Sequence, residues 1–458
     1  MLEHAWPGMV QAAPVGQSAL VGGKAMRWDE RVFGNQAGGV FRAMLTLAAG
    51  GAAAKVIGLA SIPLITRLYS PGQMGILSTF TAIVAILAPF ATLRYVTAIP
   101  MPRRDGTAIN LLVLNLLILS GVTLLIALIA WSVGPAMLSM ASLGSLEPYL
   151  WLIVLGVGVT AFYEVLTLWG TRKKTFKTLA LSQTNQAITG GLVKIGLGLA
   201  GFKPIGLLVG QIAQQGGGAL PLLRRCIIEV RLHRNAVALR RMRALAAHYQ
   251  DMPRYRLPSH VLLMLSMQGP GLFSAQLFGM ETAGQLGLAL TALALPLSLV
   301  GTTMANAYFA EISAIGRKNP ASVLAITRSV TKRLIVLSLP AALMLMAFGP
   351  WIFSIVFGER WEMAGQFARI LSIYLVFQFI SSPLGNALTL FRRQDLFLKM
   401  NLGRFAMIVV IFLAARLLGW DSRFTLLVYS ASLSIHYLIS NRIIFSVIKQ
   451  HAREQSQP

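Results

Sequence analysis

Long apolar stretches separated by short polar segments dominate the chain from residue 44 to residue 447. A helix needs about 20 residues to cross a hydrocarbon layer of about 30 Å, and most of these stretches reach that length. Backbone groups in lipid must hydrogen-bond within their own segment, so each stretch is expected to be an α-helix. The predicted spans are Met44–Thr66, Gly72–Ile99, Ala108–Trp131, Pro148–Gly170, Thr178–Ala200, Ile205–Leu223, Leu257–Gly279, Thr282–Ala310, Leu334–Phe357, Met363–Leu390, Leu396–Leu418 and Thr425–Val447.

The connections between these spans are alternately rich and poor in Lys and Arg. With both termini in the cytoplasm, the inner segments hold 30 of the 40 Lys and Arg residues, and the outer loops hold five. Lys and Arg accumulate in the short cytoplasmic loops of membrane proteins. The pattern therefore predicts an all-α integral membrane protein with about twelve transmembrane helices and cytoplasmic ends.

The two halves of the chain carry similar patterns at an offset of 209 residues. Leu68-Tyr69 is followed by Gly75, and Leu277-Phe278 is followed by Gly284. Because each half has an even number of spans, the copies have the same orientation and should be related by an axis along the membrane normal. The predicted organisation is a cytoplasmic tail over residues 1–43, a six-helix bundle over 44–223, a basic cytoplasmic linker over 224–256, a second six-helix bundle over 257–447 and a cytoplasmic tail over 448–458.

The linker over residues 224–256 contains nine arginines. A basic segment beside a membrane helix is attracted to anionic lipid by about 1 kcal/mol per residue. We therefore expect the linker to lie on the membrane surface. A dedicated regulatory site is the alternative.

Composition supports the membrane class and excludes others. Hydrophobic residues make up 55% of the 458 residues, charged residues only 12%, and the mean hydropathy is +0.67. The net charge of +25 lies mostly in the short connections, where it sets topology, so nucleic acid is not expected as a partner. Metal-ligand spacings, a P-loop and a nucleophile elbow are absent from the sequence. The chain is therefore predicted to be no enzyme and to use no cofactor or metal.

Charged residues inside the predicted spans are mostly basic. An ionised group at bilayer depth costs a few kcal/mol, so such groups usually face an aqueous path or the substrate. The excess of cations predicts an anionic cargo, for which these cations are the candidate binding residues. The interior cations are Lys55, Arg94, Lys194, Arg369 and Arg404, and the interior carboxylate is Glu164. Glu164 is the candidate for coupling to an ion or proton.

Lys55 lies midway along the first predicted span. Gly51, Gly58 and Ser61 share its helical face, which is therefore small and partly polar. We expect Lys55 to point into the bundle. Its contact there is either the cargo or Glu164.

A stripe of polar residues follows one face of the fifth predicted span and ends at Lys194. Amide side chains join helices in membranes, which is one interpretation of the stripe. A cation is a poor helix–helix contact, so we expect Lys194 to line a cavity. The stripe contains Gln183, Gln186, Gly190 and Lys194, and the sixth span has a similar group in Gln211, Gln214 and Gln215.

Arg369 and Arg404 each lie about two turns inside a predicted span. A guanidinium can hold a phosphate or pyrophosphate through two parallel hydrogen bonds. Extension of the side chain to the lipid headgroups is the alternative. It applies most readily to Arg94, near the cytoplasmic end of its span. Gly269-Pro270-Gly271 in the seventh span is the candidate hinge.

Several motifs resemble the Wzx-like bacterial polysaccharide flippases, a family within the superfamily of multidrug, oligosaccharidyl-lipid and polysaccharide exporters. The motifs are the segments Pro63–Gly75, Leu93–Pro100, Leu168–Lys177, Gly206–Gly210, Leu277–Gly284 and Leu295–Val300. The resemblance implies translocation of an undecaprenyl-pyrophosphate-linked oligosaccharide across the bacterial inner membrane, for O-antigen, exopolysaccharide or capsule. It also implies membrane lipids, a polysaccharide polymerase and a chain-length regulator as partners.

Three other functions remain open. A peptidoglycan lipid-precursor flippase would carry the same lipid pyrophosphate. A cation-coupled multidrug exporter would need interior carboxylates, of which Glu164 is the single example. A membrane polymerase or ligase would need long outer loops, and the longest one, over residues 132–147, carries a single charge.

Overall fold

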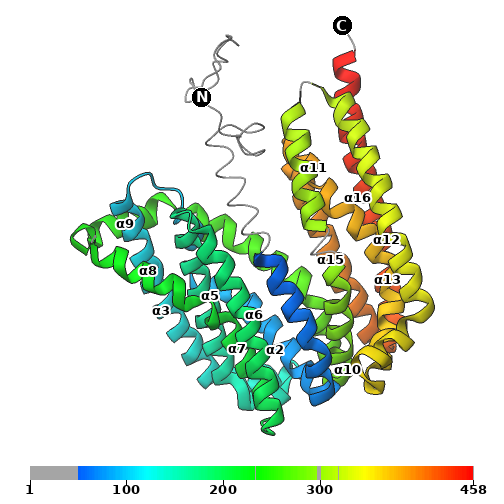
Figure 1. Ribbon diagram of the computed structural model, residues 1–458, viewed down its shortest axis with the longest axis horizontal. Helices are drawn as coiled ribbons and strands as arrows, with labels where there is room; N and C mark the ends of the chain where they lie inside the picture. Colours follow the sequence, from blue (N-terminus) through cyan, green and yellow to red (C-terminus); the bar gives the residue numbers. More distant parts are fainter. Residues whose placement is uncertain (1–49, 233, 297–300, 318, 457–458) are drawn as a thin grey trace, which may run out of the picture. The chain divides into compact units, whose positions relative to one another are not determined.

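The computed structural model describes residues 50–232, 234–296, 301–317 and 319–456 (Figure 1). In these ranges the chain forms helices and no strand, which confirms the all-α class. Nine of the described helices are long and apolar enough to cross a membrane. The predicted fifth and sixth spans fall on shorter or more polar helices, and the eighth begins in the second part of α10, which belongs to the same long apolar segment as the seventh. The predicted N-terminal tail lies outside the described residues.

Helices of the first half begin with Gly50–Leu68. The helices that follow are α2 (Pro71–Ala91), α3 (Asp105–Ser132), α4 (Gly134–Met140), α5 (Leu150–Arg172), α6 (Phe176–Leu199), α7 (Ile205–Gly217), α8 (Ala219–Leu232) and α9 (Leu239–His248). Short turns of other helix types occur at η1 (Tyr95–Ala98), η2 (Gly144–Tyr149), η3 (Arg234–Ala236) and η4 (Met252–Arg256).

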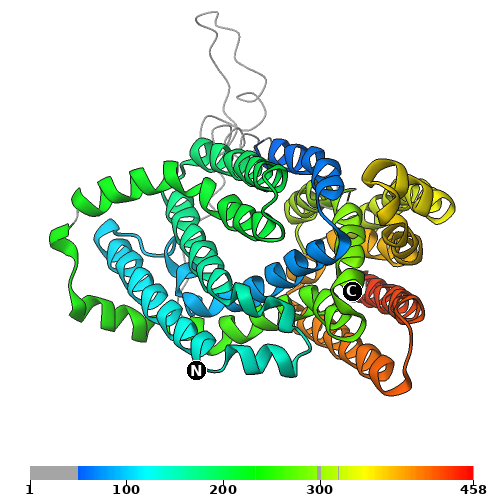
Figure 2. The same ribbon diagram turned by 90° about the horizontal axis from the view of Figure 1, so that it is seen from below.

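The second half is built from longer helices. They are α10 (Leu257–Pro296), α11 (Thr302–Ile315), α12 (Pro320–Phe357), α13 (Glu362–Leu384), α14 (Asn386–Leu390), α15 (Gln394–Leu418) and α16 (Ser422–Ser456), with the turn η6 (Glu359–Trp361) before α13. In Figure 2, α15 and α16, drawn in orange and red, lie side by side, and they pack against each other.

Local sequence sets the start of α2. The Ser70 side chain accepts a hydrogen bond from the backbone of Gln73, and the Gln73 side chain accepts one from the backbone of Ser70. This capping box satisfies amide groups that the first helical turn leaves without partners. Pro71 occupies the first turn, where its missing N–H costs nothing.

The end of α2 corrects a predicted boundary. The second span was expected to run to Ile99, but α2 ends at Ala91. Leu93 and Arg94 then adopt positive φ angles of 44° and 60°, which break the helix. The apolar residues after them form the turn η1 and are buried against α3 and α5. Their hydrophobicity therefore reflects burial in protein, and Arg94 lies in a turn between helices.

Gly279 breaks α10 into two helical segments. Its φ of 83° and ψ of 171° lie outside the helical region, at a conformation that glycine adopts easily. This break separates the predicted seventh and eighth spans within a few residues of the expected boundary. The candidate hinge at Gly269-Pro270-Gly271 has helical geometry in the described conformation, and its role as a hinge stays a prediction.

The crossing of α2 and α10 joins the two halves of the chain (Figures 1 and 2). A Cβ atom on Gly75 would lie 1.7 Å from the carbonyl oxygen of Met280. Trp361 adds a second link, because its fully buried indole N–H donates to the carbonyl oxygen of Thr66 at 3.0 Å. The halves are therefore in direct contact, through backbone as well as side chains.

Apolar side chains also cover the outside of the helices. On α3, Leu124, Leu125 and Leu128 are all more than half exposed, and on α12 Val336 and Phe348 are too. Contiguous exposed apolar surface of this kind is rare on soluble monomers. It fits helices whose outer faces contact lipid.

Candidate functional site

Arg404 is held in the second half of the chain by neutral partners. It lies on α15, and its Nε–H donates to Ser266 Oγ on α10 at 3.0 Å. Its Nη1 donates to the Tyr437 hydroxyl on α16 at 3.3 Å. Ser266 and Tyr437 are both buried. In the described ranges, no carboxylate forms an ion pair with Arg404, so its positive charge is not compensated by protein.

A cluster of aromatic residues lies next to this guanidinium. Tyr437 belongs to a buried cluster that also contains Tyr374 and Tyr429, whose rings meet edge to face with centroids 5.8 Å apart. Phe412 of α15 packs on Tyr429 with centroids 6.2 Å apart. Arg404 therefore lies next to an aromatic cluster formed by α13, α15 and α16, which it contacts through Tyr437.

Lys194 is buried in the contact between α6 and α7. Its ammonium donates to Gln211 Oε1 at 2.7 Å and to Gln214 Oε1 at 2.9 Å. Gly210 allows this approach, because a Cβ atom there would lie 2.3 Å from Lys194 Cγ. The polar stripes of the fifth and sixth predicted spans thus face each other. Lys194 takes part in that contact. The stripe therefore joins two helices, which is one of the two interpretations that the sequence allowed.

A small cavity lies beside the Lys194 cluster. Its volume is about 60 Å³, and Gln211 forms part of its wall together with Phe80 and Thr160. The Thr160 hydroxyl is buried and has no hydrogen-bond partner among the described residues. The space suits a few water molecules and is far too small for an oligosaccharide.

Arg94 and Glu164 form an ion pair, with Nη1 and Oε1 2.7 Å apart. The Arg94 side chain is 11% exposed and that of Glu164 is 32% exposed. The alternative that Lys55 pairs with Glu164 is therefore wrong, since Glu164 pairs with Arg94. With its charge compensated, Arg94 is the weakest of the five candidates for binding an anion.

Lys55 is half-buried on the Gly50–Leu68 helix. The expected small face does meet α6: a Cβ atom on Gly51 would lie 3.1 Å from Gln183 Oε1, and one on Gly191 would lie 3.4 Å from Ser61 Cβ. Gly58 has open space around it. The face of the helix that carries Lys55 therefore turns partly toward the polar stripe of α6.

Arg369 is exposed on α13, where its Nη2 donates to the Ala347 carbonyl oxygen of α12 at 3.1 Å. Arg94, Lys194, Arg369 and Arg404 thus contact four different sets of residues. Their assembly in one cationic cavity stays a prediction. Arg404 and Lys194 share a chemical feature, because each is a cation held by neutral oxygen atoms.

An ion network beyond the predicted site residues ties α3, α5 and α8 together. Arg172 and Lys173 both contact Asp105, at 2.7 and 3.0 Å, and Lys173 also pairs with Glu229. Burial opposes the charge on Lys173, but the hydrogen bonds to Glu229 and Asp105 outweigh it, so the pKa of this ammonium is raised. Sequence reasoning counted these residues as loop charges and missed their pairing.

A polar stripe on α16 was also missed. Ser430, Ser434, Tyr437 and Asn441 recur at helical spacing, the same signal that identified the stripe on α6. Ser430 donates to the Ile370 carbonyl oxygen at 2.7 Å, and Asn441 accepts from Ser381 at 2.8 Å. The stripe faces α13 and supplies Tyr437 to Arg404. In the part of the chain that the structure describes, no group of three or more His, Cys, Asp or Glu residues could hold a metal.

Solved structures share this arrangement of helices. A multidrug resistance MATE family transporter of the MOP superfamily, in an outward-facing conformation, is 15% identical over 95% of this chain and 100% of its own, with a TM-score of 0.60. An inward-facing conformation of such a transporter is 13% identical over 88% of this chain and 95% of its own, with a TM-score of 0.53. These likenesses show a shared fold.

A third structure is a MOP superfamily transporter from Pyrococcus furiosus. It is 14% identical over 95% of this chain and 100% of its own, with a TM-score of 0.55. The description of that structure says that the reverse polarity of its binding pocket suggests a different function for that transporter.

Sequence comparison gives the family. No curated protein matches the chain. The family model for polysaccharide biosynthesis proteins matches residues 64–366, more than half of the 458 residues. This match shows that the chain belongs to the polysaccharide biosynthesis protein family, and its helical fold is that of the MOP superfamily transporters.

Proposed function

We propose that this protein is a flippase for an undecaprenyl-pyrophosphate-linked oligosaccharide unit, acting by alternating access in the bacterial inner membrane. The unit would pass from the cytoplasmic to the periplasmic leaflet for assembly of O-antigen, exopolysaccharide or capsule. Both termini would be cytoplasmic. A polysaccharide polymerase and a chain-length regulator would use the product.

The uncompensated charge of Arg404 is the observation that carries this proposal. A guanidinium has five N–H donors. Two of them are used by Ser266 and Tyr437, which leaves three for an incoming anion. A pyrophosphate presents several acceptor oxygens and can take parallel hydrogen bonds from one guanidinium. The Tyr437 hydroxyl can also donate its own proton to a phosphate oxygen.

Lys194 supports an anionic cargo in a different way. Its two glutamine partners are neutral, so the N-terminal half also contains a buried positive charge without a carboxylate at that site. We assign Lys194 to attraction of the polar head, and Lys55 and Arg369 to contacts along its path. The isoprenoid tail would remain in lipid, where the apolar outer faces of the helices meet it.

Glu164 has a different role in this proposal. Its ion pair with Arg94 joins α5 to the turn after α2. Protonation of Glu164, or exchange of its partner for an ion, would release Arg94. The pair could therefore couple transport to an ion gradient, although the site would function without coupling if the product is consumed downhill.

A cation-coupled multidrug exporter is the alternative that the fold itself favours, because the structural neighbours include multidrug transporters. Export of cationic drugs needs acidic groups in the binding region. Glu164 is already paired, and Arg404 and Lys194 would repel a cation. A peptidoglycan-precursor flippase is chemically closer, since its cargo carries the same lipid pyrophosphate.

Transport by the purified protein tests the proposal. The protein is reconstituted in vesicles with a fluorescent undecaprenyl-pyrophosphate-linked oligosaccharide, and a membrane-impermeant quencher reports the share of cargo in the outer leaflet. We expect wild-type protein to translocate this cargo and Arg404→Ala to lose most of that activity. The matched control is Arg416→Ala, an exposed arginine near the other end of the same helix.

The same vesicles separate the rival functions. If the protein translocates a peptidoglycan lipid precursor in preference to the undecaprenyl-pyrophosphate-linked oligosaccharide, it is a peptidoglycan-precursor flippase. Uptake of a cationic dye driven by a sodium or proton gradient, without movement of either lipid, would overturn the proposal.

A further inference from the structure

Helix α8 has one face that packs on the protein. Leu222 and Cys226 are buried there, in the cluster that contains Trp169 of α5 and Leu179 of α6. Glu229 continues this face one turn later and pairs with Lys173. The inner face of α8 is therefore fixed by apolar packing and by one ion pair.

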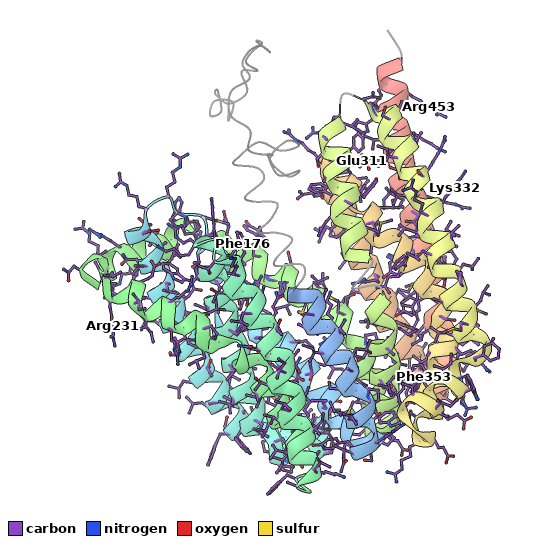
Figure 3. The ribbon with its side chains drawn as sticks, in the orientation of Figure 1. Phe176, Arg231, Glu311, Lys332, Phe353 and Arg453 are labelled. Atoms are coloured by element: carbon purple, nitrogen blue, oxygen red, sulfur yellow. The ribbon has the colours of Figure 1, made fainter. Side chains whose placement is uncertain are left out.

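The opposite face of α8 mixes arginines with large apolar residues. Ile227 is 41% exposed and Ile228 is 59% exposed, and they lie between the exposed Arg224 and Arg231. Figure 3 shows Arg231 near the outer end of α8, with its side chain directed away from α5 and α6. A face exposed only to water would not need two neighbouring isoleucines. Arginines interleaved with apolar residues are typical of helices that lie at the lipid–water interface.

The segment after α8 is anchored to the bundle. Asn110 of α3 is fully buried, and its side chain donates to the Ala236 carbonyl oxygen at 2.8 Å and accepts from the Ala238 amide at 2.9 Å. The Tyr95 hydroxyl donates to the Ala246 carbonyl oxygen at 3.0 Å. These contacts hold α9 against the rest of the protein, so its arginines have a defined position.

Positive charge on this segment is not balanced by the protein. We call the segment from Arg224 to Arg256 the basic strap. Its acidic residues are Glu229 and Asp251, and Glu229 already pairs with Lys173. In the described part of the strap, none of the exposed arginines forms an ion pair. These exposed arginines are Arg224, Arg225, Arg231, Arg240, Arg241, Arg243, Arg254 and Arg256.

We propose that the basic strap is a binding surface for anionic phospholipid, with the arginines on the headgroup phosphates and Ile227 and Ile228 inserted at the level of the first acyl carbons. An acidic peptide or a nucleic acid would account for the arginines only. Phospholipid accounts for both the charge and the exposed isoleucines. The strap would thus hold the cytoplasmic ends of α3 and α5 at the membrane surface.

Lipid binding to the full-length protein tests this proposal. Purified protein in detergent is titrated with phosphatidylglycerol or phosphatidylcholine, and bound lipids are counted by native mass spectrometry. We expect tighter binding of phosphatidylglycerol to wild-type protein. The triple variant R224Q/R225Q/R231Q should lose about fivefold in affinity for each arginine removed. The variant R224K/R225K/R231K keeps the charge and should retain most of the preference.

A matched control removes the same charge elsewhere. The variant R360Q/R416Q/R423Q changes three exposed arginines outside the strap and should bind phosphatidylglycerol as wild type does. An equal loss in this control, or no loss in R224Q/R225Q/R231Q, overturns the proposal. Displacement of phosphatidylglycerol by inorganic phosphate at matched ionic strength would also overturn it, since the surface would then bind phosphate and not lipid.

The outcome does not depend on the cargo. Phosphatidylglycerol binding involves none of the residues that we assign to the oligosaccharide carrier, so either proposal can fail while the other holds. Ile227→Ser with Ile228→Ser tests the apolar part separately. The double variant should bind phosphatidylglycerol more weakly at unchanged net charge, and unchanged binding would contradict the insertion of the isoleucines.

Discussion

Gly75 and Gly284 meet backbone to backbone where α2 crosses α10. A Cβ atom on Gly284 would lie 1.9 Å from the Pro71 carbonyl oxygen and 2.7 Å from the Gly75 amide nitrogen. A Cβ atom on Gly75 would lie 1.7 Å from the Met280 carbonyl oxygen. Pro71 and Met280 are separated by 209 residues, as are the two glycines. The same contact is therefore made twice, with the roles of the two helices exchanged.

This crossing predicts a large effect from a small substitution. Gly284→Ala places a methyl group on a backbone oxygen that cannot move independently, so the two helices must separate. Overpacking of this kind costs about 1 to 3 kcal/mol, which exceeds the helical preference for alanine. We expect a lower midpoint of thermal unfolding in detergent. Gly121→Ala on α3, where a Cβ atom meets open space, is the control and should be neutral or stabilising. Equal midpoints for both variants would contradict the crossing.

Substitution of Arg404 should lower the affinity for pyrophosphate more than it lowers the stability of the fold. Arg404→Gln removes charge-assisted hydrogen bonds worth about 1.5 to 3 kcal/mol, so affinity for an undecaprenyl pyrophosphate should fall about 10-fold to 100-fold. Arg404→Lys should be intermediate, because an ammonium cannot form the parallel pair of bonds. Isothermal titration of the purified variants gives the affinities. Unchanged affinity in Arg404→Gln would remove this residue from the binding site.

The Arg94–Glu164 pair predicts coupling between two substitutions. Glu164→Gln leaves a mostly buried guanidinium without its charge partner and should lower stability by about 1 to 3 kcal/mol. Arg94→Gln combined with Glu164→Gln should be less destabilised than the sum of the single variants. Thermal unfolding of the four proteins in the double-mutant cycle measures the difference. Additive effects would show that the two residues act independently.

The same cycle, read in transport assays, separates pairing from coupling. If Glu164 serves only to hold Arg94, the double variant regains the transport that Glu164→Gln loses. A stable double variant that remains inactive assigns Glu164 to ion or proton coupling.

Lys194 predicts a structural cost at the contact of α6 with α7. Lys194→Met keeps the length of the side chain but leaves Gln211 and Gln214 without their common donor. Stability should fall by about 1 to 3 kcal/mol. Lys177→Met changes an exposed lysine on the same helix and should have little effect. The measurement is again thermal unfolding, and a stable Lys194→Met variant with lost transport would show that Lys194 serves the cargo alone.

The positions of most helices could be predicted from hydropathy, because an apolar stretch in lipid must satisfy its backbone hydrogen bonds as a helix. The break near Gly279 agrees with the predicted boundary between two spans. The start of α12 does not: it begins at Pro320, whereas the predicted span starts at Leu334. Val323 and Thr327 are buried on one side of this extension, and Arg328 and Lys332 are exposed on the other. An amphipathic stretch has no long apolar run, so a search for apolar spans cannot find it.

The candidate site was less predictable than the helices. The interior cations could be found because charge is rare in apolar spans. Their partners could not, since hydropathy does not say which faces of α10, α15 and α16 meet, and these faces bring Ser266 and Tyr437 to Arg404. Arg94 shows the reverse error: an apolar sequence on both sides placed it within a span, but a turn buried among neighbouring helices surrounds it.

The reciprocal contact of Gly75 and Gly284 has a consequence for the origin of the chain. In a two-fold symmetric homodimer, both subunits use the same surface, and each residue pair across the interface occurs twice. A protein of half this length, with one such edge, could have paired with an identical molecule before gene duplication joined the two. The glycine would then have been fixed once, in the ancestor, and inherited at both positions.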